Sequence, residues 1–331
     1  MLSKLIKNTT WYNFSTQNTA KNIIHIGYGI DDNFARCTAS SIVSFCVNNP
    51  DKDFIFHILI MKLSKQNMQR LELLAKELSI TLILYEIDTT YILDKFPSSS
   101  IFTTAMYFRY ILPLLLNNVD KVIYIDGDTL CINNADELFN IDITDYIIAA
   151  VPDSQWANDN RNKDLKLINH TYFLSGMLII NVNEYKKFHT FNKLIQFLSS
   201  NPNNLIFPDQ DTLNVILTQK VKYIDFRFNY AKVENITNKN INDIIILHFA
   251  TIPKPWQLSW YVYPKTTSIN RYLYRNYEKF TPWNKEKYLP PKTYKEMEHY
   301  SKDLRKKGHY LLSIKWYLKY IINKFNTYCA S

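Results

Sequence analysis

Short apolar runs alternate with segments of helical periodicity over the first part of the chain. The runs at residues 22–29, 54–61 and 82–87 predict buried strands, because they are short, apolar and rich in β-branched or aromatic residues. Residues 33–47 and 65–78 carry apolar side chains at spacings of three and four, which predicts helices. This alternation is typical of an α/β protein, with a parallel or mixed sheet covered by helices on both faces.

The pattern continues to about residue 260 and then stops. A segment rich in asparagine, residues 233–243, predicts a loop, and four prolines beyond residue 260 indicate a linker. We therefore expect three parts: an N-terminal extension over 1–21, a large domain over 22–262 and a C-terminal helical region over 263–331. Within the large domain, the later elements are a helix over 105–116, strands over 122–125, 146–151 and 173–181, and a helix over 184–198.

The composition supports a large core and places most of the positive charge in the tail. The chain has 331 residues, 47% of them hydrophobic, and a formal charge of +9. Residues 285–331 hold eleven Lys and Arg against four Asp and Glu. The N-terminus lacks a secretory apolar run, and no stretch of about 18 apolar residues occurs, which predicts a cytosolic protein or one peripheral to a membrane. The four cysteines are scattered, so we expect neither a zinc site nor a disulfide framework.

An acidic triplet, Asp126-Gly127-Asp128, directly follows the apolar run at 122–125. Two carboxylates two positions apart at the end of a buried strand can turn toward one hard divalent cation, which can also bind a substrate's phosphates. Such triplets are common in surface turns as well. Four of the five glycines lie at predicted strand ends near acidic or small polar residues, which favours one shared site.

Polar residues also follow the first predicted strand. The glycines in 27–29 allow the backbone to approach a ligand closely, and Asp31 and Asn33 can hydrogen-bond a base and a ribose. The alternative is a tight turn in which Asp32 or Asn33 caps the following helix.

Two further segments carry candidate binding groups. Asp209 and Gln210 can hold a sugar at the rim of the sheet, or Asp209 can cap the helix that follows. His248 leaves a predicted strand and can supply a neutral imidazole as a third metal ligand. Lys254, flanked by prolines, can meet phosphate oxygens as a fixed charge.

Six segments, in this order, resemble the motifs of glycosyltransferase family 8, and within it the bacterial lipopolysaccharide glucosyl- and galactosyltransferases. The resemblance implies a GT-A fold, a UDP-hexose donor, Mn²⁺ or Mg²⁺, retention of anomeric configuration, and a lipopolysaccharide core sugar as acceptor. The segments are IGYGIDDNF, MYFRYILP, KVIYIDGDTL, YFLSGMLIIN, FPDQDTLN and HFATIPKPW.

The resemblance also implies roles for single residues. Leu174 and Thr251 depart from it, since the family usually has Asn and Gly at these positions, and these two departures leave the exact donor open. By position in the motifs, the resemblance implies that Asp126, Asp128 and His248 bind the metal and that Lys254 contacts the diphosphate. It places Asp31 and Asn33 at uridine, and Gly29 and Ser175 in the nucleotide-sugar site. It places Arg109 and Asp153 at the donor, and Asp209 and Gln210 facing the sugar.

The sequence leaves open both the mechanism of transfer and the class of protein. Because Gln210 is a poor nucleophile, we expect front-face attack rather than a double displacement. The triplet with Thr129 also resembles the nucleophile and acid pair of a haloacid-dehalogenase-type phosphatase. The departures at Leu174 and Thr251 suggest a third class, a membrane-attached sugar-nucleotide-binding protein without transfer activity.

Apolar and basic residues are interleaved from Leu304 to Phe325. Their spacings of three and four predict one helix lying in the interface of an anionic membrane, the alternative being a helix packed on the large domain. We therefore expect a peripheral protein on the cytoplasmic face of the inner membrane, with no nucleic-acid partner.

Overall fold

The computed structural model describes residues 5–15, 23–91, 103–201 and 205–329. The chain forms two compact units, each coherent in itself. The first unit comprises Met1–Tyr230 with Asp243–His248, and the second comprises Ala231–Asn242 with Phe249–Ser331.

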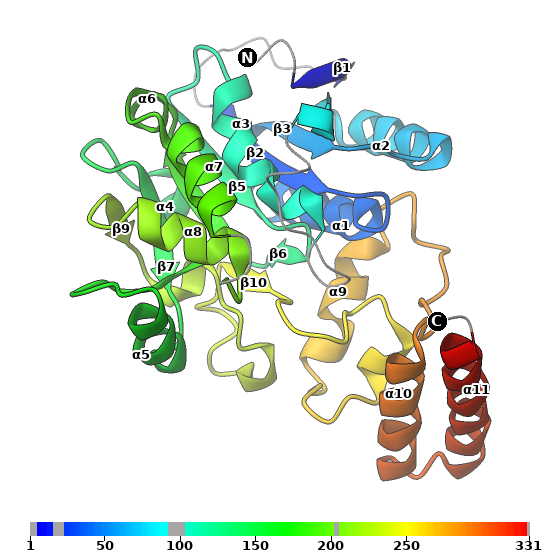
Figure 1. The fold of residues 1–331 in the computed structure, drawn as a ribbon. Coiled ribbons are helices and arrows are strands. Elements are labelled where there is room, and N and C mark those ends of the chain that lie inside the picture. Colours follow the sequence, from blue (N-terminus) through cyan, green and yellow to red (C-terminus); the bar gives the residue numbers. More distant parts are fainter. Residues whose placement is uncertain (1–4, 16–22, 92–102, 202–204, 330–331) are drawn as a thin grey trace. The chain divides into compact units, whose positions relative to one another are not determined.

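A mixed sheet of eight strands forms the centre of the first unit, in the order β1-β4-β3-β2-β5-β8-β7-β9 (Figure 1). β2, β3, β4 and β5 are parallel to one another, while β1 and β8 run antiparallel to their neighbours. β6 and β10 form a second, two-stranded antiparallel sheet. The strands are β1 (Ile6–Asn13), β2 (Ile23–Ile30), β3 (Asp53–Ile60), β4 (Thr81–Ile87), β5 (Lys121–Ile125), β6 (Thr129–Cys131), β7 (Ile148–Pro152), β8 (Phe173–Asn181), β9 (Val221–Tyr223) and β10 (Ile246–His248).

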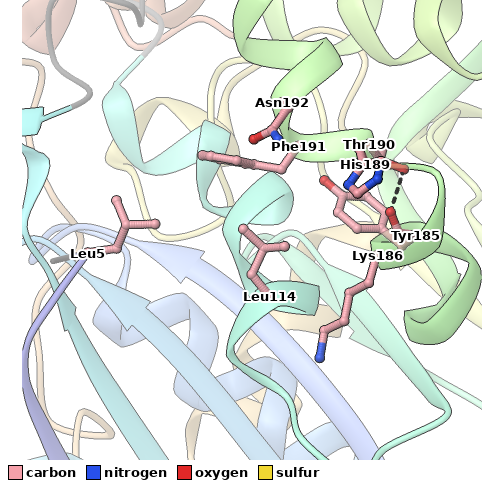
Figure 2. A pocket seen from close by; sticks show the side chains of 8 residues that line it. All are labelled: Leu5, Leu114, Tyr185, Lys186, His189, Thr190, Phe191 and Asn192. Carbon is pink, nitrogen blue, oxygen red and sulfur yellow. Dashed lines mark hydrogen bonds between the residues drawn. The ribbon is translucent and has the colours of Figure 1, made fainter. Parts of the chain in front are cut away.

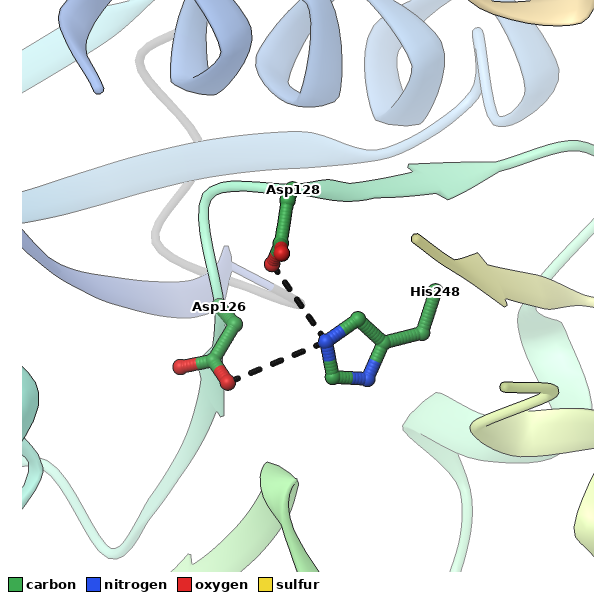
Figure 3. A group of neighbouring side chains, drawn as sticks. All are labelled: Asp126, Asp128 and His248. Atoms are coloured by element: carbon green, nitrogen blue, oxygen red, sulfur yellow. Dashed lines mark ion pairs between the residues drawn. The ribbon is translucent and has the colours of Figure 1, made fainter. Parts of the chain in front are cut away.

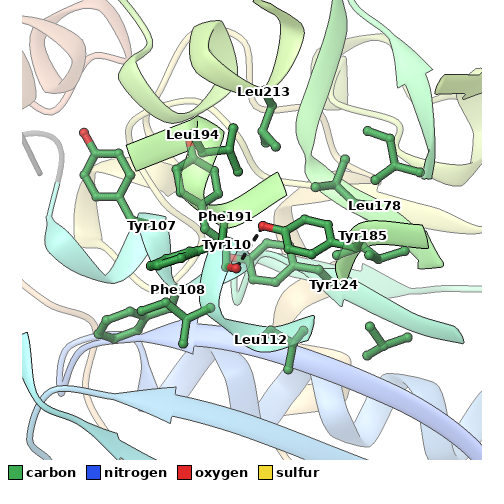
Figure 4. Close-up of a cluster of buried hydrophobic side chains, with 14 of the residues drawn as sticks. Tyr107, Phe108, Tyr110, Leu112, Tyr124, Leu178, Tyr185, Phe191, Leu194 and Leu213 are labelled. Carbon is green, nitrogen blue, oxygen red and sulfur yellow. Dashed lines mark hydrogen bonds between the residues drawn. The ribbon is translucent and has the colours of Figure 1, made fainter. Parts of the chain in front are cut away.

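Helices cover both faces of the large sheet. On one face, Phe45 of α1 packs edge-on against Phe54 of β3. On the other face, α3, α6, α7 and α8 enclose the main core, in which the Tyr185 hydroxyl donates to the Tyr110 carbonyl oxygen at 2.9 Å (Figure 4). The helices of this unit are α1 (Ala35–Asn48), α2 (Lys65–Leu78), α3 (Phe108–Leu115), α4 (Asp136–Phe139), α5 (Gln155–Asp164), α6 (Val182–Lys187), α7 (Thr190–Ser200) and α8 (Pro208–Ile216).

A small cavity of about 150 Å³ opens beside α6 and α7, on the α3 side of the sheet (Figure 2). Leu5, Leu114 and Tyr185 contribute to its lining, and the Thr190 hydroxyl at its edge donates to the Tyr185 carbonyl oxygen at 2.9 Å. The residues predicted to bind metal or sugar do not line this cavity.

Most elements predicted in the first unit are confirmed to within two or three residues, and two of these predictions need correction. The single helix predicted over 184–198 is two helices, α6 and α7, because the chain turns at His189, whose φ of 54° is left-handed. The helix predicted over 105–116 begins as a 3-10 turn, Thr104–Tyr107, before α3 starts. The sequence pattern also gave no sign of β1, which pairs antiparallel with β4.

The second unit is helical, with α9 (Asn270–Glu278), α10 (Tyr294–Lys306) and α11 (Tyr310–Cys329). The prediction of one helix from Leu304 to Phe325 is wrong, because Gly308, with φ +81°, separates α10 from α11. Leu304 and Trp316 are buried in the small core that the two helices share. No helix among the described residues is long and apolar enough to cross a membrane.

Candidate active site

The acidic triplet connects the two sheets of the first unit. Asp126 directly follows β5, and its backbone N–H donates to the Gly176 carbonyl oxygen of β8 at 2.8 Å, while Asp128 leads into β6. β10 pairs with β6 in a register that sets His248 opposite Thr129, the residue after Asp128. Strand pairing therefore brings His248 beside the triplet, although the two are distant in sequence.

Asp126, Asp128 and His248 form a group whose ligand atoms all lie within 4.8 Å of one another (Figure 3). The His248 Nε2 atom is 3.3 Å from Asp128 Oδ1 and 3.9 Å from Asp126 Oδ2. Two carboxylates and one imidazole are a donor set that suits Mn²⁺, and the carboxylate oxygens suit Mg²⁺.

Neighbouring residues leave room for a cation and orient the ligands. A Cβ atom on Gly176 would lie 2.3 Å from His248 Cε1 and 2.9 Å from Asp126 Oδ2, so only glycine fits there. His248 Nδ1 pairs with Asn229 Oδ1 at 2.9 Å. Because Asn229 Oδ1 is an acceptor, this bond fixes the proton on Nδ1 and leaves the Nε2 lone pair facing the carboxylates. The residues present therefore fit a divalent metal.

Arg109 holds two of the predicted acids together. Its guanidinium pairs with Asp126 Oδ1 at 2.8 Å and with Asp209 Oδ2 at 3.0 Å, and it donates to the Ser175 carbonyl oxygen at 2.7 Å. The Tyr124 hydroxyl also donates to Asp126 Oδ1, at 3.0 Å. Oδ1 is thus fully engaged by protein donors, while Oδ2 faces His248 and Asp128.

Burial disfavours the ionised form of the Asp126 carboxyl, and neighbouring positive charge favours it. Burial raises the pKa of Asp126, and the positive charge of Arg109 opposes this rise. A bound cation would favour the ionised form further.

Asp209 and Gln210 extend this network from the first turn of α8. Asp209 Oδ2 accepts from the Ser175 hydroxyl at 3.0 Å, so the alternative in which Asp209 caps α8 is wrong. Gln210 Oε1 accepts from the Ser175 backbone N–H, and its Nε2 donates to Asp153 Oδ2, each at 2.9 Å. Eight of the predicted residues thus form one connected group: Arg109, Asp126, Asp128, Asp153, Ser175, Asp209, Gln210 and His248.

The segment after β2 forms a tight turn outside this network. Asp31 Oδ1 accepts from the backbone N–H groups of Asn33 and Phe34, at 2.9 and 3.1 Å. Neither Asp32 nor Asn33 caps α1, since Asp32 instead accepts from the start of α2. A Cβ atom on Gly29 would lie 2.6 Å from the Ala105 carbonyl oxygen, so this glycine admits the 3-10 turn before α3 rather than space for a ligand.

Lys254 and Thr251 lie in the second unit, immediately after β10. The Lys254 backbone N–H donates to Gln257 Oε1 at 2.8 Å, and its ammonium donates to the Phe249 carbonyl oxygen at 2.6 Å. Leu174 is half-buried in β8, next to Ser175. The roles assigned to these residues, and to Asp31, Asn33 and Gly29, stay predictions.

Sequence reasoning missed the buried group that anchors α8. Asp211 is fully buried and pairs with Arg161 of α5 at 2.8 Å. It also accepts from the Tyr172 hydroxyl at 2.6 Å and from the backbone N–H groups of Ile206 and Phe207. The only sign of it in the sequence is Asp211 itself, an acid in the first turn of α8.

An Asp-x-Asp turn at the end of a strand in a mixed α/β sheet, joined by a histidine in a group that could hold a metal ion, is typical of a GT-A glycosyltransferase. The chain belongs to glycosyl transferase family 8, whose sequence model matches residues 25–259. The family's C-terminal model matches residues 270–324. This membership is incompatible with the haloacid-dehalogenase interpretation.

Similar proteins span nearly the whole chain. The lipopolysaccharide 1,3-galactosyltransferase of Salmonella typhimurium is 28% identical over 97% of this chain and 97% of its own length. The lipopolysaccharide glucosyltransferase WaaO of Escherichia coli is 27% identical over 91% of each. The crystal structure of galactosyltransferase LgtC with donor and acceptor sugar analogs superposes with a TM-score of 0.66 and 20% identity, over 78% of this chain and 96% of that one. This last likeness concerns the fold.

Proposed function

We propose that this protein transfers glucose or galactose from a UDP-sugar to a core sugar of lipopolysaccharide, with a divalent metal and with retention of configuration. The observation that carries this proposal is the connection of the group Asp126, Asp128 and His248, through Arg109, to Asp209. The names of the full-length relatives support the hexose and the acceptor.

The difficult step is breaking the bond between the anomeric carbon and the β-phosphate. Mn²⁺ or Mg²⁺, which Asp126, Asp128 and His248 would hold, would supply Lewis-acid stabilisation of the UDP leaving group. Arg109 favours the ionised form of Asp126 and orients its carboxylate for this role, since it places a fixed positive charge at Oδ1. Lys254 adds a further positive charge for the diphosphate.

The geometry of Gln210 supports front-face attack. The nucleophile in a double displacement would be Gln210 Oε1, an amide oxygen whose nucleophilicity is lowered further because it accepts from the Ser175 backbone N–H. Its Nε2 is held by Asp153, so the amide plane is fixed at both ends. Gln210 and Asp209 therefore act by orienting the sugar and shielding the cationic centre that develops.

A metal-dependent assay tests the proposal against a sugar-nucleotide-binding protein without turnover. We expect the wild type to hydrolyse UDP-glucose or UDP-galactose slowly with Mn²⁺, and to transfer the hexose to delipidated core oligosaccharide. Asp128→Ala should abolish both reactions and Mn²⁺-dependent UDP binding, because it removes a charged ligand. Asp145→Ala, an exposed acid in the same unit, is the matched control. UDP-sugar binding without turnover in the wild type would favour the non-catalytic class.

The second unit offers a surface for the cytoplasmic face of an anionic membrane. On α11, Leu311, Ile314, Leu318, Ile322 and Phe325 recur at spacings of three and four and are 54–88% exposed. This stripe lies opposite the side of α11 that packs on α10, as helical periodicity requires.

Charge favours a membrane as the occupant of this stripe. Lys315 and Lys319 flank it, and basic residues near an anionic leaflet contribute roughly 1 kcal/mol each. Ile314→Ser with Ile322→Ser should release the protein from vesicles containing phosphatidylglycerol while leaving UDP-sugar hydrolysis intact. Leu73→Ser, an apolar position on α2 that is 45% exposed, is the control. Equal sedimentation of the double variant and the wild type would contradict membrane attachment through α11.

A further inference from the structure

A cavity of about 350 Å³ lies within the second unit. One wall is the segment that follows β10, from Ile252 to Pro264, and the other is α10. The residues that α10 contributes, including Glu296, His299 and Asp303, recur at spacings of three and four, so they form one face of the helix. The volume lies in the range of about 300–1,000 Å³ that is usual for small-ligand sites.

The polar groups of this cavity have hydrogen-bonding capacity left over. Within the described part of the chain, the hydroxyls of Ser259 and Tyr263 make no hydrogen bond. Gln257 accepts the Lys254 backbone N–H through Oε1, which leaves its amide N–H groups as donors. The Asp303 side chain is 15% exposed, and burial raises the pKa of its carboxyl. Buried or half-buried groups of this kind gain from a ligand that supplies partners.

The charges of the wall select a neutral ligand. Lys302 pairs with Glu298 at 2.6 Å, and Lys306 lies 3.8 Å from Asp303. Because both lysines have acidic partners and Asp303 presents a carboxylate, a phosphate gains little here. An apolar chain would leave the hydroxyls and amide unsatisfied. A pyranose offers hydroxyls that both donate and accept, together with a C–H face that can pack on Tyr263.

Two residues that line the cavity are connected to Lys254, the residue assigned to the diphosphate. Pro253 lines it and directly precedes Lys254, while Gln257 both lines it and holds the Lys254 backbone. We propose that this cavity is a subsite for a neutral hexose unit of the acceptor glycan, bound by Gln257, Ser259, Tyr263 and Asp303. This inference rests on the proposed function and extends it to the acceptor.

Acceptor binding by the full-length protein tests the subsite without requiring turnover. The probe is delipidated, truncated core oligosaccharide, titrated by calorimetry in the absence of a donor. Tyr263→Phe should weaken binding by about fivefold, because one neutral hydrogen bond is lost, and Asp303→Asn by at least about tenfold. Matched controls in the second unit are Tyr294→Phe and Glu234→Gln, neither of which lines the cavity. Both controls should bind like the wild type.

Kinetics separates this inference from the proposed function. The two cavity variants should raise the KM for acceptor while the KM for UDP-sugar, the rate of UDP-sugar hydrolysis and the melting temperature stay at wild-type values. If the wild type transfers hexose but Tyr263→Phe and Asp303→Asn bind the oligosaccharide normally, the subsite is wrong and the proposed function stands. Weakening of equal size in the two control variants, or no binding by the wild type, would also overturn the subsite.

Discussion

The buried pair of Arg161 and Asp211 gives the sharpest prediction about stability. Asp211→Asn keeps the shape of the side chain but removes the charge opposite Arg161, which is 1% exposed. Breaking a buried pair costs about 3–5 kcal/mol, a large part of a typical stability of about 5–15 kcal/mol. In Asp211→Asn one of the two carboxylate oxygens becomes an NH₂ group. Either the Tyr172 hydroxyl or the two backbone N–H groups then lose their acceptor, which lowers the free energy of unfolding further.

Urea unfolding and thermal melting measure this effect. We expect the melting temperature of Asp211→Asn to fall by roughly 10 °C, since each kcal/mol shifts it by about 2–4 °C in a unit of this size. Asp164→Asn is the control, because Asp164 pairs with the same guanidinium at 2.7 Å but is 56% exposed, and should cost at most about 1 kcal/mol. The reasoning is refuted if both variants lose the same stability, or if Asp211→Asn lies within about 1 kcal/mol of the wild type.

Three further predictions follow from single residues. Gly176→Ala should lower transfer by at least about tenfold, because its Cβ would meet His248 at 2.3 Å, and Mn²⁺-dependent UDP binding should fall with it; unchanged binding would mean that the strand shifts without disturbing the ligands. Burial and the neighbouring His25 lower the pKa of His57 to about 3. Between pH 6.5 and 3 the unfolded chain therefore binds a proton at His57 that the folded chain does not bind, so stability is full above pH 6.5 and falls below it. The free energy of unfolding in urea should differ between pH 7 and pH 5 by about 2 kcal/mol more in the wild type than in His57→Gln. Lys254→Ala should raise the KM for UDP-sugar more than Lys265→Ala does, and equal kinetics for the two would show that Lys254 is only a surface charge.

The parts of the fold that could be predicted are those set by local pattern. The helix predicted over 65–78 is α2 with the same bounds, and the strand predicted over 173–181 is β8, because each has its own periodicity and ends. The chain turn at Gly308 was missed, since the apolar spacing of the tail continues through the break and a lone glycine is a weak signal there.

Within the candidate site, residue types were predictable and partnerships were not. Arg109 was expected at the donor, but its use of Asp126 and Asp209 as partners depends on how α3 and α8 pack on the sheet. Asn229 had no motif to mark it, because its function is to orient a histidine that pairing of β10 brings nearby. Tyr124 could have been found, since a strand places residues two apart on the same face and it precedes Asp126 by two.

The pairing of β6 with β10 has a consequence for synthesis on the ribosome. β6 leaves the exit tunnel more than a hundred residues before β10, and the excursion Ala231–Asn242 belongs to the other unit. Until β10 emerges, the Asp128 end of β6 has an unpaired edge, and the long loop makes its closure slow. His248 therefore joins Asp126 and Asp128 only after the rest of the first unit has been translated, and the three side chains cannot share one cation before then.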